Sequence, residues 1–444
     1  MDTGADEPLR VSVVGDWDIE VGCGRIDVDE ETVRIEAPVR LAVSPLEPIV
    51  VERERYDHLP IFDRKAPGWK RGVRLVGCRS QETTVKDGLN PASLMVYCAA
   101  EGAACYEAGR DYEADLEWAT FGRLPGGRIQ DVQAVFVSYR YGLSRIDAVV
   151  VEQSGAVFLR SGKPHGCAPR PPDVESNERA LANIWIPGRL LSLTDDYLFP
   201  IQRDAFGQPE PASWACAEAC LPRTLKKLQD GETVRILAWG DSVTDAGYLE
   251  VKGDRWQAQF ASRLQARFPE AEIELQTVGW GGQRSRSFVD ETADSPYSYR
   301  TKVLGSGADL IVSEFVNDSA LNADQVDAQY GRFLADFRSM GAEWTILTPH
   351  YVRPDWMGLT SQKHVDEDPR PYVHALRAFA EREGVALADA SVRWGRLWRQ
   401  GIPYITLLLN AINHPDGRGM RMFADSLMAL FPTDSYLTQM NGEA

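Results

Sequence analysis

Residues 234–245, with the sequence V-R-I-L-A-W-G-D-S-V-T-D, decide the expected fold of this chain. The apolar run 234–238 is short and is bounded by Gly240, which is typical of a buried strand in a parallel sheet. Ser242 follows on the turn after this strand. A serine hydroxyl becomes an effective nucleophile only where a base takes its proton and N–H groups stabilise the negative charge that develops. The stretch therefore predicts either a nucleophilic serine or an ordinary turn in which Asp241 and Ser242 cap the next helix.

Two further polar loops also follow expected strands. The sequence G-W-G-G-Q-R-S at 279–285 comes after the apolar run 273–278, and F-V-N-D at 315–318 comes after 310–314. In an open α/β sheet, the loops after parallel strands converge on one crevice at the carboxyl edge of the sheet. We therefore expect these two loops and the loop that carries Ser242 to lie together.

Near the end of the chain, the sequence N-A-I-N-H-P at 410–415 contributes a histidine. Serine, glycine, asparagine and histidine in this order resemble the SGNH branch of the GDSL hydrolases, a family of esterases and lipases, over about residues 230–432. The resemblance implies that Ser242 is the nucleophile and His414 the base. It also implies an oxyanion hole formed by the backbone N–H groups of Ser242 and Gly282 and by the side-chain amide of Asn317.

The chain departs from the family pattern at two positions. The family usually has aspartate three residues before the histidine, where this chain has Ala411, and glycine two residues before the asparagine, where it has Phe315. Without that aspartate, we predict a Ser-His dyad in which a backbone carbonyl or an amide orients His414. The alternative is a substitute carboxylate from one of three residues, Asp245, Asp318 and Asp416.

The residues expected around the crevice are polar and aromatic. They include the candidate substrate-binding residues Trp280, Arg284, His350, Arg353 and Trp356. His350 is also an alternative base, or a loop histidine packed among Tyr351, Pro354 and Trp356. Such a set suits an acylated sugar better than a long acyl chain. We therefore predict a serine esterase that deacylates, most simply deacetylates, a carbohydrate or similar small polar ester.

Three other readings of the function stay open at this point. The chain could be a carbohydrate-binding protein whose catalytic site has decayed, or it could use the same fold for acyl transfer or glycoside cleavage. No metal or organic cofactor is expected for an esterase of this kind. The six histidines include no H-x-x-x-H pair, and the chain has no P-loop Gly-Lys-Ser/Thr sequence.

The length of 444 residues predicts two or three domains. Residues 1–210 contain short runs rich in Val, Ile, Phe and Tyr, and the runs 146–151 and 156–159 are expected to form a hairpin. This half is therefore predicted to be a mostly β, sandwich-like domain whose role the sequence does not indicate. Residues 211–444 alternate strand and helix, which predicts a three-layer, doubly wound parallel sheet. The expected boundary is the Pro- and Gly-containing stretch 203–213.

Four aromatic residues of the β-rich half, Trp17, Trp69, Tyr139 and Tyr141, have two possible roles. They could form a platform that binds sugar, but aromatic residues in strands are more often part of the core. The core interpretation is the preferred one.

The composition limits the binding partners and the cellular compartment that can be expected. The net charge of −17 argues against nucleic acid and against anionic membrane surfaces as partners. No apolar run approaches the length of a membrane span, and no signal peptide is visible, so a cytoplasmic location is expected. The seven cysteines are scattered and odd in number, which indicates reduced thiols. No particular oligomeric state is indicated.

Overall fold

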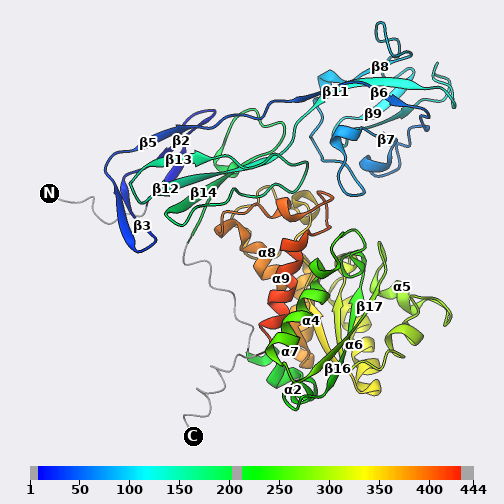
Figure 1. The fold of residues 1–444 in the computed structure, drawn as a ribbon. Helices are drawn as coiled ribbons and strands as arrows, with labels where there is room; N and C mark the ends of the chain where they lie inside the picture. The colour runs from blue at the N-terminus through cyan, green and yellow to red at the C-terminus, as the bar shows by residue number, and fades with distance from the viewer. Residues whose placement is uncertain (1–8, 203–212, 432–444) are drawn as a thin grey trace. The chain divides into compact units, whose positions relative to one another are not determined.

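The computed structural model describes residues 9–202 and 213–431, which form two compact units (Figure 1). The first unit contains residues 9–202 together with Ser361–Lys363 and Leu397–Ile412, and the second contains the rest. These two short segments come from the C-terminal half of the chain but pack with the N-terminal half. The expected boundary at 203–213 lies outside the described residues, except for Ser213.

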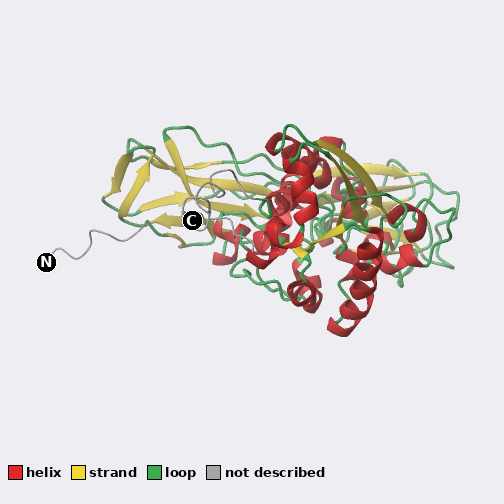
Figure 2. Ribbon diagram, turned by 90° about the horizontal axis from the view of Figure 1, so that it is seen from below, coloured by secondary structure: helices red, strands yellow, loops and turns green. Residues whose placement is uncertain are grey.

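Strands and loops build the first unit, whereas helices are concentrated in the second (Figure 2). The strands of the first unit are β1 (Val11–Val13), β2 (Asp18–Val21), β3 (Gly24–Val28), β4 (Glu31–Ile35), β5 (Val39–Ala42), β6 (Ile49–Tyr56), β7 (Val73–Arg74), β8 (Met95–Tyr97), β9 (Tyr112–Asp115), β10 (Thr120–Arg123), β11 (Val135–Tyr141), β12 (Arg145–Glu152), β13 (Val157–Arg160), β14 (Glu178–Ile186) and β15 (Leu198–Pro200). Every paired strand of this unit is antiparallel to its neighbour, and β12 and β13 form the predicted hairpin. The prediction of a β-rich N-terminal half is therefore confirmed.

Two apolar clusters form the interior of the first unit. One gathers buried residues of β1–β4, β12 and β14, and the other gathers residues of β8–β11 and the loops around them. Tyr139 is a core residue of the second cluster and Tyr141 packs against it, while Trp17 packs against the first. These three aromatic residues follow the core interpretation. Trp69 contacts the ring of Trp118, with ring centroids 4.8 Å apart.

A five-stranded parallel sheet forms the centre of the second unit. Its strands are β16 (Thr233–Gly240), β17 (Glu272–Gly279), β18 (Leu310–Glu314), β19 (Glu343–Leu347) and β20 (Ala386–Ala388), in the order β17-β16-β18-β19-β20. All four neighbouring pairs are parallel. This is the doubly wound order in which the direction of winding reverses between the first and third strands, here β16 and β18.

Helices cover both faces of this sheet, as predicted for a three-layer fold (Figure 1). They are α1 (Ala217–Cys220), α2 (Pro222–Gln229), α3 (Ser242–Asp245), α4 (Trp256–Arg267), α5 (Ser285–Val289), α6 (Ala323–Met340), α7 (Pro371–Glu383), α8 (Ala390–Gly395) and α9 (Gly417–Met428). Leu237 and Trp239 of β16 belong to one apolar cluster with residues of α6 and α7. Because successive side chains of a strand point to opposite faces, Ile236 and Ala238 point to the other face, where α4 and α9 pack together.

Trp239 is the centre of the aromatic core on the α6/α7 face. Its ring makes edge-to-face contacts with Phe315 at 4.8 Å, Phe333 at 5.0 Å and Phe288 at 5.7 Å between centroids. Phe315 is 2% exposed, so the departure from the family's glycine at this position supplies a core side chain. None of the helices in the described ranges is both long enough and apolar enough to cross a membrane.

Candidate active site

The carboxyl ends of β17, β16 and β18 bring the three predicted loops together at the point where the sheet reverses its winding, which is the usual ligand site of such folds. Gly240, the last residue of β16, allows the strand end, the serine turn and β18 to lie this close together. A Cβ atom there would lie 2.1 Å from Thr244 Oγ1 and 2.3 Å from the Glu314 carbonyl oxygen. Any larger residue would therefore push apart the strand end and the turn that presents Ser242.

Ser242 and His414 are 172 residues apart in the sequence but meet in the structure. His414 Nε2 lies 3.2 Å from Ser242 Oγ, within hydrogen-bond distance. Ser242 begins α3 and is half-buried, while His414 is 6% exposed. The imidazole of His414 stacks on the ring of Tyr248, with centroids 4.2 Å apart and planes inclined by 3°. This stacking restricts the orientation of the imidazole plane.

The other two predicted loops are linked to the serine turn by hydrogen bonds. A Cβ atom on Gly281 would lie 3.8 Å from Ser242 Cβ, so the loop that contains Gly282 passes directly beside the serine. Asn317 donates its backbone N–H to Asp241 Oδ2 at 2.9 Å and its Nδ2 to the carbonyl oxygen of Gln283 at 3.2 Å. The structure thus brings together the four residues that the sequence motifs selected.

Below this turn lie three buried carboxyl groups, Asp241, Glu314 and Asp318. Burial raises the pKa of Asp241 to about 7, although the carboxyl group also accepts hydrogen bonds from the backbone N–H groups of Val243 and Asn317. Burial and the neighbouring Asp241 raise the pKa of Glu314 well above its usual range. Neither Glu314 oxygen has a hydrogen-bond partner among the described residues. A carboxyl group in this environment favours the neutral form.

His350 was a candidate substrate-binding residue, and in the structure it supports the loop that carries His414. It is fully buried, packs against Trp394 and Phe423, and its Nε2 lies 2.9 Å from the Asn413 carbonyl oxygen. Because a carbonyl oxygen can only accept, this nitrogen carries the proton. Burial, with Arg370 nearby, holds the pKa of His350 well below its usual value. The His350 side chain therefore exposes no surface to solvent in this structure.

The three carboxylates considered as substitutes for the missing aspartate each have other partners. Asp318 accepts hydrogen bonds from Ser285 and Tyr330. Asp416 caps the N-terminus of α9 and pairs with Arg418, with Nε and Oδ2 2.7 Å apart. Asp245 is exposed and accepts from the backbone N–H of Gly247 at 3.3 Å.

The remaining candidate substrate-binding residues differ in how accessible they are. Trp356 is 53% exposed, and Arg284 is exposed at the start of α5. Trp280 is half-buried and stacks on Tyr297, with centroids 4.4 Å apart. Arg353 is only 5% exposed, pairs with Asp355, and lies over the Trp356 ring at 5.8 Å. Arg353 therefore packs beside Trp356 and exposes little of its own side chain.

Sequence reasoning did not find Tyr248, Asp241 or Glu314 as members of the site. Asp241 was interpreted only as a helix cap, and its second contact to Asn317 depends on how β16 and β18 pair. Tyr248 follows the serine motif by six residues in a loop without regular pattern. The only sequence signal for Glu314 is a charge at the end of an apolar run, which is unusual in a buried strand.

Comparison with known proteins agrees with this geometry. Residues 238–422 match the GDSL-like Lipase/Acylhydrolase family. The match begins in β16, just before the serine turn, and ends in α9, just after the histidine. No curated protein matches the chain.

Several solved structures are similar to part of this chain. A mutant of an acetyl-xylooligosaccharide esterase from Geobacillus is 16% identical, with a TM-score of 0.36, over 44% of this chain and 93% of that one. A two-domain esterase active on acetylated mannans is 14% identical, with a TM-score of 0.38, over 47% of this chain and 51% of that one. A member of the lipolytic G-D-S-L family from Veillonella parvula is 16% identical, with a TM-score of 0.31, over 44% of this chain and 96% of that one.

Proposed function

The chain belongs, through residues 238–422, to the GDSL-like lipase/acylhydrolase family, and on this premise we propose that it deacylates a carbohydrate ester through a Ser-His mechanism. Family membership makes the chain a hydrolytic enzyme. The observation that carries the proposed mechanism is the 3.2 Å distance between Ser242 Oγ and His414 Nε2, because a base must reach the proton that it removes. Ser242 is the nucleophile and His414 the general base.

The reaction proceeds in two steps. His414 takes the hydroxyl proton as Ser242 Oγ attacks the ester carbonyl, and the protonated imidazole then donates that proton to the leaving alcohol. The oxyanion accepts hydrogen bonds from the backbone N–H groups of Ser242 and Gly282 and from Asn317 Nδ2, which has a second N–H besides the one bound to Gln283. Water, deprotonated by His414, then releases the acyl group from the serine.

The accessible surface of the second unit supports a short acyl group on a polar alcohol. Among its described residues, the exposed large apolar side chains are Val251, Leu275 and Trp356. They do not amount to the continuous apolar track that a long acyl chain would need. An exposed indole with an exposed guanidinium at Arg284 suits a sugar, which presents C–H faces for aromatic packing and hydroxyl groups for hydrogen bonds.

The test combines covalent labelling with turnover. A fluorophosphonate probe is expected to label the wild-type chain at Ser242 and to leave Ser242→Ala unlabelled. The wild type should release acetate from acetylated xylo- and manno-oligosaccharides and hydrolyse p-nitrophenyl acetate much faster than the palmitate ester. In Ser242→Ala, kcat should fall by about 10⁴-fold or more. Ser319→Ala, which changes an exposed serine in the same unit, is the matched control and should keep labelling and activity.

Two outcomes would contradict the proposal. Near-normal turnover in Ser242→Ala would exclude this serine as the nucleophile. Faster turnover of the palmitate ester than of acetylated sugars would exclude the proposed substrate class while leaving the serine chemistry intact.

A further inference from the structure

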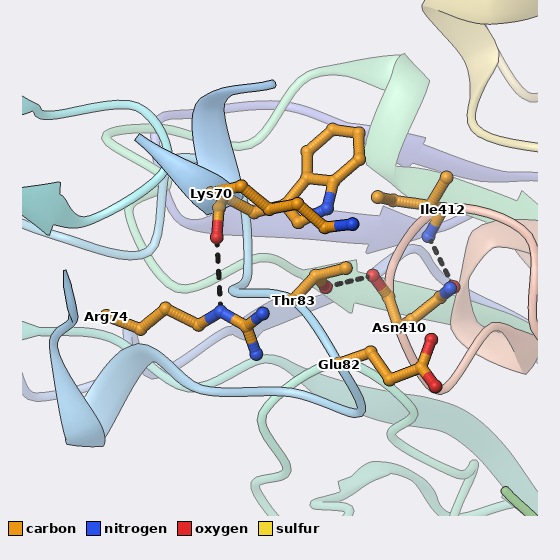
Figure 3. A pocket seen from close by; sticks show the side chains of 7 residues that line it. Lys70, Arg74, Glu82, Thr83, Asn410 and Ile412 are labelled. Carbon is orange, nitrogen blue, oxygen red and sulfur yellow. Dashed lines mark hydrogen bonds between the residues drawn. The ribbon is translucent and has the colours of Figure 1, made fainter. Parts of the chain in front are cut away.

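The first unit contains a pocket of about 500 Å³ that the proposed ester chemistry does not use. Pockets for small molecules typically measure about 300–1,000 Å³. Its lining residues are Trp69, Lys70, Arg74, Glu82, Thr83, Asn410 and Ile412 (Figure 3). Two stretches that are more than 300 residues apart in the sequence thus build one pocket inside one compact unit.

The inner wall of the pocket is buried and held by hydrogen bonds. Thr83, Asn410 and Ile412 are each 2–3% exposed. Thr83 Oγ1 donates to the Asn410 carbonyl oxygen at 2.6 Å, and the Ile412 backbone N–H donates to Asn410 Oδ1 at 3.0 Å (Figure 3). Gln81 extends this connection, because its backbone N–H donates to the Leu409 carbonyl oxygen at 3.2 Å. A wall fixed in advance loses little conformational freedom when a ligand binds.

The position of Trp69 is also fixed. It lies in a short 3-10 helix, Gly68–Lys70, next to Trp118, and Arg74 Nε donates to its carbonyl oxygen at 3.1 Å. Gly68 is required for this packing, because a Cβ atom there would lie 2.0 Å from Trp118 Cδ1. Trp69 itself is half-buried, so part of its surface faces the pocket.

The charges around the pocket select the class of ligand. Lys70 and Arg74 are cationic and Glu82 is anionic, so the lining presents charges of both signs. A neutral polyhydroxylated ligand suits both signs, since each hydroxyl group donates to a carboxylate and accepts from an ammonium or guanidinium group. An indole beside these groups provides an apolar surface for sugar C–H groups. We propose that this pocket binds a neutral glycosyl unit.

The pocket wall continues along the chain into the catalytic loop. Asn410 and Ile412 precede His414 by four and two residues in the sequence. If the proposed esterase function holds, we expect the pocket to bind sugar of the same class as the substrate, and a ligand held against Asn410 and Ile412 to affect turnover through the short stretch of chain that leads to His414. This link to the substrate rests on the proposed function. Sugar binding by the pocket is independent of it.

The binding test uses the full chain carrying Ser242→Ala, with unacetylated xylotriose and mannotriose as probes and trigalacturonate as the anionic comparison. Calorimetry should detect binding of at least one neutral trisaccharide and weaker binding of the anionic one. Adding Trp69→Ala should weaken that binding by about tenfold, and Trp69→Phe should weaken it less. Glu82→Gln, an exposed change that does not threaten the fold, should also weaken binding, whereas the matched control Glu101→Gln should not.

Binding that is unchanged in both Glu82→Gln and Trp69→Phe would overturn the proposal, as would preferential binding of trigalacturonate. The absence of binding to both neutral trisaccharides by the folded Ser242→Ala chain would also overturn it.

A kinetic comparison separates this inference from the proposed function. With Ser242 intact, Glu82→Gln should lower the ratio of kcat/KM for acetylated trisaccharide to kcat/KM for p-nitrophenyl acetate, mainly through KM, and Glu101→Gln should keep the wild-type ratio. An unchanged ratio in Glu82→Gln would exclude the link to the substrate. If the wild type hydrolysed neither ester, the proposed function would fail, and the calorimetric result would still decide whether the pocket binds sugar.

Discussion

Asn317 makes its two contacts through different groups, so its side chain can be removed without releasing the backbone. The backbone N–H is held by Asp241, and the side-chain amide donates to Gln283. Asn317→Ala should therefore lower kcat by roughly 10²–10³-fold, the usual loss for one oxyanion donor, with little change in KM. Steady-state kinetics on an acetylated oligosaccharide, with the melting temperature measured in parallel, would check this.

The matched control for Asn317→Ala is Gln283→Ala, which keeps the carbonyl oxygen that accepts from Asn317. It should retain kcat close to the wild-type value. A wild-type kcat in Asn317→Ala would instead exclude this amide from the oxyanion hole.

Tyr248 is expected to act as a positioning residue for His414, because its ring stacks on the imidazole at 4.2 Å. Aromatic contacts of this kind contribute about 0.5–1.5 kcal/mol, so Tyr248→Ala should lower kcat by roughly 2- to 10-fold. Tyr248→Phe keeps the ring and should lie closer to the wild type than Tyr248→Ala does. If the two variants lose the same activity at equal stability, ring stacking does not position the histidine.

At the scale of elements, the parallel pairing of β16 and β18 places the buried Asp241 and Glu314 side by side at the carboxyl edge. Both groups have pKa values raised in the folded state, above unfolded values of about 3.9 and 4.3. Above about pH 4 the native chain therefore holds more protons at these groups than the unfolded chain does. Their contribution to the free energy of unfolding falls as the pH rises, by about 1.4 kcal/mol per pH unit for each proton of difference.

Glu314→Gln removes one of these titrations and keeps the shape of the side chain. The melting temperature of this variant relative to the wild type should rise between pH 5 and pH 8. The control Glu381→Gln, at an exposed position on α7, should show no such trend. A melting-temperature difference that is the same at every pH would mean that Glu314 does not titrate differently in the folded and unfolded chains.

At the scale of the whole molecule, the segment Leu397–Ile412 joins the first unit although the sequence around it belongs to the second. Asn183 of β14 donates its side-chain amide to the Gly401 carbonyl oxygen at 2.8 Å, and Ile201 pairs with Gln400. The same segment continues through Asn413 to His414. The β-rich half therefore contributes to holding the chain just before His414.

Asn183→Ala should lower the free energy of unfolding by about 1–3 kcal/mol, because Gly401 is buried and its carbonyl oxygen would lose its donor. Denaturant unfolding would measure this. Asn177→Ala, at an exposed position whose amide bonds to Glu152, is the matched control and should change stability by less than about 0.5 kcal/mol. Equal effects of the two substitutions would mean that the contact to the 397–412 segment does not stabilise the molecule.

The regular elements around the site could be predicted from the sequence alone. The apolar runs 273–278 and 310–314 lie in strands β17 and β18, as expected. The serine, glycine and asparagine loops were expected to meet because strand ends in a parallel sheet share one edge, whereas the histidine was selected through the family resemblance. Apolar runs and loop motifs are formed by residues that are close together in the sequence, so they can be recognised without the structure.

Side-chain direction and long-range packing were decided only by the tertiary structure. His350 also follows a strand, yet it is buried and bonded to the loop that carries His414, and Tyr248 carries no signal for its contact with His414. Trp69 was grouped with the core aromatic residues, but it lines a pocket. The opposite wall contains Asn410 and Ile412, which are more than 300 residues away in the sequence. The sequence selected the candidate site residues. Which of them face a ligand depended on contacts between distant segments, and residue spacing does not encode those contacts.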